Sequence, residues 1–522
     1  MIVVGSGATG SYAAMELTGR GLRVLLLEAG RSVDFTREFP PVNPASAGSP
    51  HLSEWLTGRQ PIQALSSLYL AHNRHFFVDD VEAPYTCAWN RPFLWIRGRQ
   101  LGGRLHTWAR VGLRLSDDEL QAPARDGLGE PWPIRYAELA PYYDRVESFY
   151  GLEGEVDGIA ALPDGRVSRP RPLTAGERWL RETLDRGWPD RRLIAARTLG
   201  APVGTIPPPL AVAHGTGRLT AITDAVVTRV SVDPKRNLAD GVIYRDRLTG
   251  EERGARARAV MLCASTIETV RLLLASATPR HPDGLGASSG LLGRYLTEHT
   301  LVNVLAVAPG LRDDAVALQG PGGTNPYDLG GLVGFYVPPF FNVTRRDPAF
   351  ARRFALVGSV GRPTWLRPSI LGPRDAVAVL EAFGEVLPRL DNRITLHPTR
   401  TDRFGVPLAN LDFRYGENEL AMTERAATCL AELADEAGFQ RMVGPVRAPA
   451  GSSIHELGGA RMGSSRRTSV LDPQNRVWDV PNLFVTDGAS FVTSGYQNCT
   501  LTMLALTARA CEALVRDGPA AG

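Results

Sequence analysis

The sequence predicts an α/β protein whose parallel sheet is built from separate parts of the chain and carries an inserted α+β domain. Three observations favour this class. Aliphatic runs typical of buried strands occur at the beginning, in the middle and at the end of the 522 residues. Residues 300–450 instead alternate apolar and polar positions between turn signals, as antiparallel strands do. The chain is also too long for one compact core, so two domains are expected.

The first elements form a strand–helix–strand unit. Ile2–Val4 and Arg23–Leu27 read as buried strands, and Thr9–Arg20 between them reads as a helix. Parallel strands joined in this way nearly always form a right-handed crossover. The following stretch, Arg31–Arg97, is rich in Pro, Ser and aromatic residues. We expect long loops and short helices there.

The later elements follow in two groups. The first group contains two strands separated by a turn, a buried strand with its helix, and a final buried strand with a closing helix: Ala225–Val232, Gly241–Arg245, Ala257–Cys263, Ile267–Ala275, Asn482–Thr486 and Leu501–Val515. A second group contains two helices and alternating strands: Tyr136–Tyr150, Glu417–Ala437, Leu301–Val307, Gly331–Val337 and Arg393–Leu396. A discontinuous domain with an inserted sheet domain explains this order better than a string of independent domains.

Composition excludes several classes of protein. The formal net charge is only +3, and Lys235 is the sole lysine. The arginines are scattered, whereas a nucleic-acid-binding face needs a basic stripe. No stretch approaches the roughly 20 apolar residues of a membrane span. Five cysteines without a CxxC pair predict neither disulfides nor a zinc site. Since the chain also opens directly on a strand, without a signal peptide, we expect a cytoplasmic protein.

A glycine motif joins the first strand to the first helix. Gly5, Gly7 and Gly10 form a GxGxxG, in which the glycines allow a tight turn, close approach to a pyrophosphate, and contact of helix with strand. Glu28, 18 residues beyond Gly10, ends the second strand, where a carboxylate accepts hydrogen bonds from a ribose. The combination predicts a Rossmann-type dinucleotide site and disfavours NADP. It does not separate FAD from NAD.

Two further stretches resemble a known family. The run from His455 to Gly463 reads HELGGARMG and is similar to the HxxGxxRMG signature of the glucose–methanol–choline (GMC) oxidoreductases. It is followed by NLFVTDGA from Asn482 and QNCTLT from Gln497, in the order of that family's closing block. The resemblance extends to the N-terminal motif, the Gly102-Gly103 loop and the segment from Gly293 to His299, and so covers most of the chain.

The resemblance implies FAD as the cofactor. Gly102 and Gly103 would lie along the flavin and pyrophosphate, and the backbone of Val227 would meet the adenine. Asp487, followed by Gly488, would hold the ribityl chain, and the helix starting near Thr500 would direct its positive end at the flavin N1–C2=O edge. Members that link flavin to histidine carry that histidine immediately before the tryptophan, where this chain has Thr107. We therefore expect non-covalent FAD. The expected FAD-binding domain comprises residues 1–115, 200–298 and 465–522, and the substrate domain comprises residues 116–199 and 299–464.

Alcohol oxidation requires a base for the hydroxyl proton while hydride leaves carbon for flavin N5. His455 and Asn498, 43 residues apart, match the family's His/Asn pair. His455 would be the base and Asn498 its hydrogen-bonding partner, although Asn498 could also cap the following helix. We expect His299 only to pack beside the cofactor domain. The acidic run from Asp117 to Glu119 is interpreted as a solvated helix start, and no spacing predicts a metal site.

Within the family, the chain looks most like the glycoside 3-dehydrogenase and pyranose-oxidase-like branch. This likeness implies oxidation of a ring secondary alcohol of a sugar or glycoside, with C3 as the candidate carbon, and Gln497 and Tyr496 orienting the sugar hydroxyls. One alternative is oxidation of a primary alcohol of an aminoglycoside or other natural-product intermediate to the aldehyde. Two others are a non-redox flavin-containing lyase and an electron-transfer flavoprotein subunit. The sequence does not distinguish oxygen, quinone or cytochrome as electron acceptor.

Overall fold

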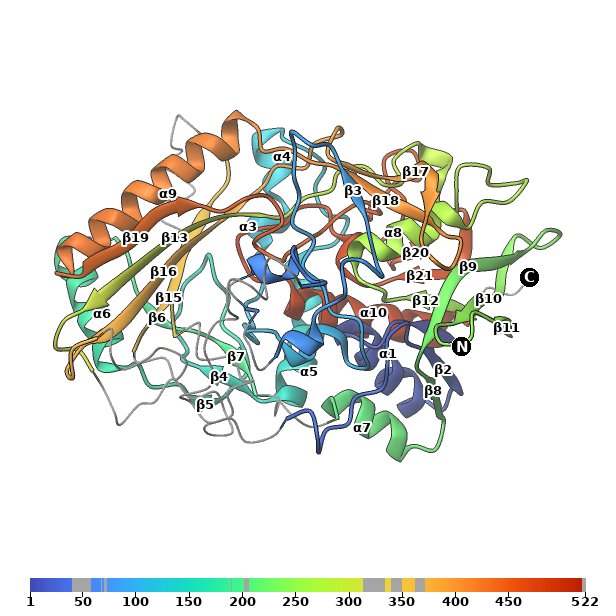
Figure 1. The fold of residues 1–522 in the computed structure, drawn as a ribbon, viewed down its shortest axis with the longest axis horizontal. Helices are drawn as coiled ribbons and strands as arrows, with labels where there is room; N and C mark the ends of the chain where they lie inside the picture. The colour runs from blue at the N-terminus through green and yellow to red at the C-terminus, as the bar shows by residue number, and fades with distance from the viewer. Residues whose placement is uncertain are drawn as a thin grey trace.

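The computed structural model of the protein describes residues 1–39, 58–66, 68–69, 73–188, 190–200, 206–312, 334–338, 350–361 and 371–518. Two sheets with their helices lie side by side (Figure 1). The parallel sheet occupies one half of the molecule, and a long antiparallel sheet covered by α6 and α9 occupies the other. Within the described ranges, no helix has the length and apolar character needed to cross a bilayer.

The parallel sheet has six strands in the order β20-β21-β12-β1-β2-β8. Adjacent strands from β21 to β8 run parallel, and only β20 is antiparallel to its neighbour. Their bounds are β1 Ile2–Val4, β2 Val24–Leu27, β8 Leu219–Ile222, β12 Val260–Leu262, β20 Arg476–Val477 and β21 Val480–Val485. The prediction of one sheet built from the beginning, middle and end of the chain is therefore confirmed.

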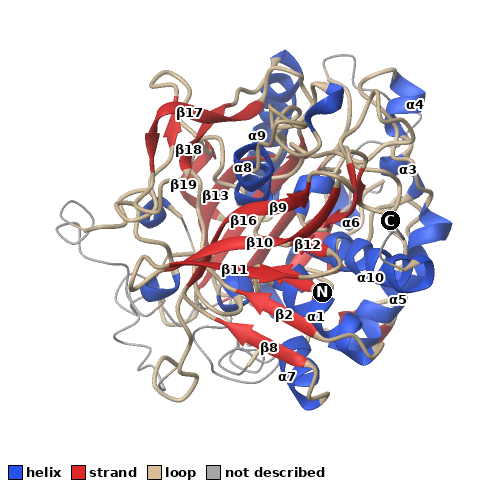
Figure 2. Ribbon diagram, turned by 90° about the vertical axis from the view of Figure 1, so that its right-hand side faces the viewer, coloured by secondary structure: helices blue, strands red, loops and turns tan. Residues whose placement is uncertain are grey.

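Helices cover the faces of this sheet (Figure 2). α1 contacts α10 and α7, and α10 also contacts α5. The helices are α1 Ala8–Gly19, α5 Tyr136–Tyr150, α7 Pro208–Gly215, α8 Thr266–Ala275 and α10 Thr500–Asp517. The turn from β12 into α8 passes through Ser265, whose φ of 78° is uncommon for a residue other than glycine.

The second large sheet has the order β19-β13-β16-β15-β14-β6, and all of its pairings are antiparallel. Its strands are β6 Ile194–Ala195, β13 His299–Ala308, β14 Phe335–Val337, β15 Phe354–Gly361, β16 Ala376–Glu385 and β19 Gln440–Arg447. α6 (Ala175–Gly187) and α9 (Glu417–Glu436) close the core on one face. The predicted antiparallel sheet is confirmed; residues 331–333 of the expected strand Gly331–Val337 lie outside the described residues.

Three smaller sheets complete the fold. β9 (Ala225–Asp233), β10 (Leu238–Asp246) and β11 (Glu252–Arg256) form an antiparallel sheet beside the parallel one. The others have the orders β17-β18-β3 and β5-β4-β7, with bounds β3 Thr86–Cys87, β4 Leu152–Gly154, β5 Val167–Pro170, β7 Thr198–Leu199, β17 Arg393–Thr401 and β18 Pro407–Asp412. Two short helices, α3 (Asp117–Leu120) and α4 (Ala122–Asp126), precede α5.

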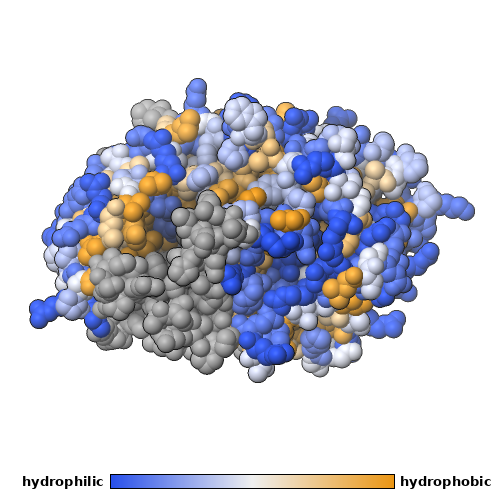
Figure 3. All heavy atoms as spheres, viewed as in Figure 1, coloured by the Kyte–Doolittle hydropathy of each residue, from blue (hydrophilic) through white to orange (hydrophobic). Residues whose placement is uncertain are grey.

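β17 and β18 contact α8, and residues of α5, β17 and β18 share one hydrophobic core with the parallel sheet. The exact domain boundaries given above stay a prediction. The surface of the face seen in Figure 3 is mostly hydrophilic, with apolar side chains gathered where the long antiparallel sheet lies in the same view.

Candidate active site

The glycine-rich turn after β1 has little room at two of its three glycines. Gly5 has a φ of 93°, and a Cβ there would overlap the carbonyl oxygen of Cys263. A Cβ at Gly10 would overlap the carbonyl oxygen of Gly5. These two positions therefore require glycine for the turn and for the close approach of α1 to β1.

Gly7 differs from its neighbours because a Cβ there would meet no atom within 4 Å. Gly7 is also the N-cap residue of α1 and provides no side-chain cap, so the first turn of the helix borders open space. The second glycine pair closes on this turn: the Gly102 amide donates to Ser6 Oγ at 2.9 Å, and the nearest atom to a Cβ on Gly103 would be Gly7 Cα at 3.2 Å. Exposed amides at a helix N-terminus, next to glycine backbone, suit a pyrophosphate.

Glu28 lies at the end of β2, against the same turn. Its carboxylate accepts hydrogen bonds from the Ser6 amide (3.0 Å), Ser6 Oγ (2.5 Å) and the Gly30 amide (2.8 Å). Burial raises the pKa of Glu28 more than these bonds lower it. β9 begins here too, since the Ala225 amide donates to the Glu28 carbonyl oxygen at 2.8 Å, and Val227 follows two residues later. The structure thus brings the predicted ribose and adenine residues together.

Asp487 and its neighbours form the far side of this edge of the sheet. The Asp487 carboxylate accepts from Thr269 Oγ1 (2.5 Å) and the Ala489 amide (3.0 Å), and burial raises its pKa to about 6. The Gly488 carbonyl oxygen accepts from the Gly458 amide at 2.8 Å, which ties this turn to the stretch after His455. α10 starts at Thr500 with no side-chain cap.

His455 and Asn498 lie next to each other, as the resemblance to the family's His/Asn pair implies. Asn498 Nδ2 lies 3.3 Å from His455 Nε2. The residue that caps α10 is Cys499, so the alternative role of Asn498 as the helix cap is not observed. Both side chains are half-buried and keep part of their surface accessible.

His299 contradicts the expectation that it only packs beside the cofactor domain. It is the first residue of β13, and its Nδ1 lies 2.9 Å from His455 Nδ1. Its other ring nitrogen, Nε2, lies 2.8 Å from the Gly495 carbonyl oxygen. The fully buried imidazole therefore bridges the loop that precedes Asn498 and the ring of His455.

These contacts fix the protons on both rings. A carbonyl oxygen can only accept, so His299 Nε2 carries a proton, and Nδ1 of the neutral ring is left as an acceptor. His455 must then donate its Nδ1 proton to His299, which leaves His455 Nε2 as an unprotonated acceptor facing the Asn498 amide. Burial lowers the pKa of His299 to about 4, and burial, His299 and Arg104 lower that of His455 well below its usual value. Both rings are therefore neutral at working pH.

The loop that carries His455 is fixed to the start of β13 by Glu298. Its carboxylate accepts from the Gly451 amide at 2.7 Å and from Ser453 Oγ at 2.9 Å. Leu457 and Thr297 also exchange backbone hydrogen bonds at 2.8 and 2.9 Å. One short stretch of chain thus positions both histidines.

Tyr496 and Gln497, predicted to orient sugar hydroxyls, are fully buried. Tyr496 Oη donates to the Ala161 carbonyl oxygen at 2.9 Å, and Gln497 Oε1 accepts from the Tyr496 amide at 3.1 Å. This geometry gives the two side chains a part in holding the loop before Asn498. Their contact with substrate stays a prediction.

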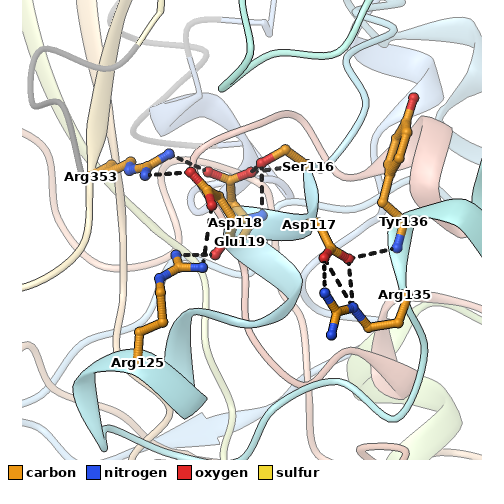
Figure 4. A network of polar contacts seen from close by, with 8 residues as sticks. All are labelled: Ser116, Asp117, Asp118, Glu119, Arg125, Arg135, Tyr136 and Arg353. Atoms are coloured by element: carbon orange, nitrogen blue, oxygen red, sulfur yellow. Dashed lines mark hydrogen bonds and ion pairs between the residues drawn. The ribbon is translucent and has the colours of Figure 1, made fainter. Parts of the chain in front are cut away.

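Behind this loop lies a polar network (Figure 4). Glu119 is buried, contrary to the interpretation of residues 117–119 as a solvated helix start, because its carboxylate accepts from the Ser116 amide (2.9 Å) and from Arg353 (2.9 Å). Asp118 accepts from the same guanidinium at 3.0 Å. Asp117 and Arg135 pair on the exposed side.

Sequence reasoning missed His299, Phe383 and Glu119 as neighbours of the site. Phe383, on β16, places its ring centroid 5.5 Å from that of His455. Of the three, only His299 could have been linked to the site from the sequence, because it ends the family-like segment that begins at Gly293.

Comparison with known proteins agrees with this geometry. The family model described as GMC oxidoreductase matches residues 388–507, and one described as an NAD(P)-binding Rossmann-like domain matches residues 3–34. The chain is 28% identical to a 2-methyl-1,2-propanediol dehydrogenase of Mycolicibacterium austroafricanum, over 99% of this chain and 95% of that protein. It is 26% identical to a paromamine 6'-oxidase of Streptomyces fradiae, over 99% and 91%.

A C-glycoside 3-oxidase of Microbacterium trichothecenolyticum is 29% identical over 57% of this chain and 54% of its own length. In structure, a formate oxidase of Aspergillus oryzae superposes with a TM-score of 0.69 at 16% identity, covering 99% of this chain and 98% of that one, which shows a shared fold. The C-terminal part of the chain thus matches the GMC oxidoreductase family, and relatives along its whole length are oxidoreductases. The protein is an FAD-dependent enzyme that oxidises an alcohol.

Proposed function

We propose that this enzyme oxidises a secondary hydroxyl on the ring of a sugar or glycoside, at C3, to the ketone. The observation that carries the proposal is the pair of histidines. His299 Nδ1 accepts a hydrogen bond from His455 Nδ1–H, which leaves His455 Nε2 unprotonated beside the Asn498 amide, at 3.3 Å. The C-glycoside 3-oxidase relative supports the choice of substrate and carbon.

In this proposal His455 Nε2 accepts the proton of the substrate hydroxyl. The ring then becomes an imidazolium, still bonded through Nδ1 to His299. The low pKa of His455 keeps the proposed base unprotonated in the free enzyme. When His455 accepts the proton, its positive charge forms next to the negative charge that develops on the hydroxyl oxygen, and the two charges stabilise each other.

Asn498 has the complementary task. Its Nδ2 carries two protons, of which one can contact His455 and the other the substrate oxygen. A prepared donor at the oxygen stabilises the negative charge that develops there. The N-terminus of α10, two residues later, adds the positive end of a helix dipole on the same side.

FAD supplies the acceptor for the hydride that leaves the substrate carbon. The residues that would hold it are those described above: Gly5, Gly7 and Gly10 with Gly102 and Gly103 at the pyrophosphate, Glu28 and Val227 at the adenosine, and Asp487, Gly488 and Thr500 at the ribityl and flavin end. The open space at Gly7 and the uncapped starts of α1 and α10 fit such a dinucleotide. Thr107 in the position of the flavin-linking histidine supports non-covalent binding.

A second candidate is oxidation of a primary alcohol on an aminoglycoside to the aldehyde. The paromamine 6'-oxidase relative favours it, because the similarity extends over 99% of this chain. His455 and Asn498 would act in the same way on either alcohol. Which alcohol is oxidised therefore depends on which carbon of the substrate is held beside His455.

The purified holoenzyme, mixed without oxygen with methyl β-D-glucopyranoside or with paromamine, tests both candidates. Bleaching of the flavin band by the glucoside, with a 3-keto product in NMR, is the expected result. An aldehyde from paromamine alone would favour the second candidate. If no alcohol tried bleaches the flavin, both proposed oxidations are refuted, and a lyase on the same fold is favoured.

A further inference from the structure

The long antiparallel sheet has two different faces. On one, alternate residues of β13 and β16, such as Val304 and Leu380, are fully buried under α6 and α9. The residues between them point to the opposite face, since side chains alternate along a strand. These are only half-buried: Asn303 and Leu305 on β13, and Val379, Glu381 and Phe383 on β16. The second face is therefore only partly covered and keeps some accessible surface.

Phe383 fixes the position of this face relative to the site. Its ring lies 5.5 Å from the His455 ring and 6.2 Å from that of His299. Glu381 is two residues along the same strand, so its side chain leaves the sheet on the same face about 7 Å away. That is roughly the span of one pyranose ring with its hydroxyls.

Glu381 has Asn303 directly opposite it on β13. Side chains at such opposed positions start about 5 Å apart, so a carboxyl and a carboxamide stand next to each other in the wall. Val357 is the opposed residue on the other side, and it offers no polar group. The pair is thus a polar patch in an otherwise apolar row.

Within the part of the chain that the structure describes, no side-chain hydrogen bond or ion pair of either residue is found. Asn303 Oδ1 is buried and accepts no hydrogen bond there. No hydrogen bond or ion pair of Glu381 occurs among those residues, and burial alone raises its pKa to about 7, without any contribution from a charged neighbour. A polar group buried without a partner costs roughly 1–3 kcal/mol. The buried, unpartnered Asn303 Oδ1 and the half-buried, unpartnered Glu381 carboxyl lie side by side, on the face that Phe383 shares, which indicates that a ligand completes their hydrogen bonds.

The nature of these groups selects the ligand. Among the described residues, no N–H donor or cation stabilises the ionised form of Glu381, so burial favours its neutral carboxyl form. A carboxyl group that is partly protonated both donates and accepts, as does the carboxamide. Adjacent groups of this kind match two neighbouring hydroxyls.

We propose that Glu381 and Asn303 form a recognition site for a vicinal pair of hydroxyls on the sugar, remote from the carbon that is oxidised. This inference rests on the proposed function and names the part of the cavity that distinguishes a sugar from a simple alcohol. Neither residue takes part in proton or hydride transfer. Both act by holding the ring.

The test compares Glu381→Gln, Glu381→Leu and Asn303→Ala with the wild-type holoenzyme. Methyl β-D-glucopyranoside and cyclohexanol, a ring alcohol without further hydroxyls, are the two probes. Anaerobic bleaching of the flavin over a range of concentrations separates the apparent Kd from the saturating rate. We expect the Kd for the glucoside to rise roughly tenfold to hundredfold in Glu381→Leu and Asn303→Ala, and less in Glu381→Gln. The saturating rate and the kinetics with cyclohexanol should change less than threefold.

Glu432→Gln, on the exposed side of α9, makes the same chemical change away from the sheet and should leave both probes unaffected. If glucoside binding is unchanged in all Glu381 and Asn303 variants, the recognition site is refuted while sugar oxidation stands. If wild type oxidises no glycoside, the proposed function fails first. With paromamine as a third probe, a loss confined to that amino sugar would assign the pair to an ammonium group and overturn the hydroxyl assignment. Glu381→Gln preserves volume, so it carries the test if Glu381→Leu does not fold.

Discussion

His455 and His299 share a hydrogen bond between their Nδ1 atoms, 2.9 Å apart, and this bond decides which nitrogen of His455 can act as a base. The buried His299 accepts this hydrogen bond at Nδ1 because its own Nε2–H is directed to the Gly495 carbonyl oxygen. In the proposed mechanism, His299 therefore acts through His455, as a positioning residue.

Replacing His299 by leucine should remove this preference. Without an acceptor at Nδ1, His455 is free to carry its proton on Nε2, and we expect the saturating rate of flavin bleaching to fall roughly a hundredfold or more. His299→Asn keeps an acceptor oxygen near the position of Nδ1 and should recover at least tenfold of that loss. Equal rates in the two variants, at equal flavin content and thermal stability, would mean that His299 only fills space.

Asn498→Asp should change the pH dependence of the same rate. The pKa of His455 is lowered, so the proposed base is neutral even below the usual pKa of a histidine, and the rate should stay level from pH 8 to about pH 6.5. A carboxylate 3 Å from Nε2 favours the imidazolium and raises that pKa, so the acid limb should move to higher pH. We also expect the rate at pH 7 to fall about a hundredfold. Asn498→Ala should lose rate without this upward shift, and a shift in both variants would contradict the explanation.

The N-terminal glycines should separate folding from cofactor binding. Gly7→Ala places its methyl in open space, so the protein should fold but bind FAD at least tenfold more weakly. Gly10→Ala places its methyl on the Gly5 carbonyl oxygen and should lower the yield of folded protein with or without added FAD. Flavin fluorescence titration and thermal unfolding measure the two effects. Full FAD affinity in Gly7→Ala would show that the cofactor does not approach this turn.

Much of this arrangement was predictable because it follows from local patterns. The strand–glycine–helix pattern at Gly5 is confirmed by the parallel pairing of β1 with β2 and β12, and the run from residue 482 by that of β21 with β12. The meeting of His455 with Asn498 followed from family-like motifs. The strand β8 was not predicted, because its four residues are partly exposed and do not form an aliphatic run like those of β1 and β2.

The contacts of His299 and Glu119 could not be read from the sequence, because they depend on tertiary structure. A histidine beginning a strand shows neither its tautomer nor its neighbour, and Glu119 lies in an acidic run that resembles an exposed helix start. Its burial results from Arg353, more than two hundred residues away. The pairing of Glu381 with Asn303 likewise depends on the register of β13 and β16.

The Glu119–Arg353 pair should contribute to stability (Figure 4). Arg353→Met leaves a buried carboxyl without its counter-charge, and we expect a loss of about 3 kcal/mol in the free energy of unfolding near neutral pH. The double variant Arg353→Met/Glu119→Gln should regain more than half of this loss. Burial already raises the pKa of Glu119, and removal of Arg353 raises it further. A carboxyl group with a raised folded pKa makes the folded protein less stable as pH rises from its unfolded to its folded pKa. The free energy of unfolding of Arg353→Met should therefore be closer to that of wild type at pH 5 than at pH 8.

His106 should make the protein less stable in mild acid. It is buried, its Nε2 donates to the Leu101 carbonyl oxygen at 2.8 Å, and burial lowers its pKa to about 4. Because the unfolded chain binds this proton at a pKa near 6.5, it carries more protons than the folded state between about pH 6.5 and pH 4, so stability falls as pH decreases through that range. The contribution of this one group is roughly 2 kcal/mol between pH 7 and pH 5. His106→Gln, compared with wild type by urea unfolding at both pH values, should show a smaller decrease by about that amount. An identical decrease in both proteins would show that His106 is not kept neutral in the folded state.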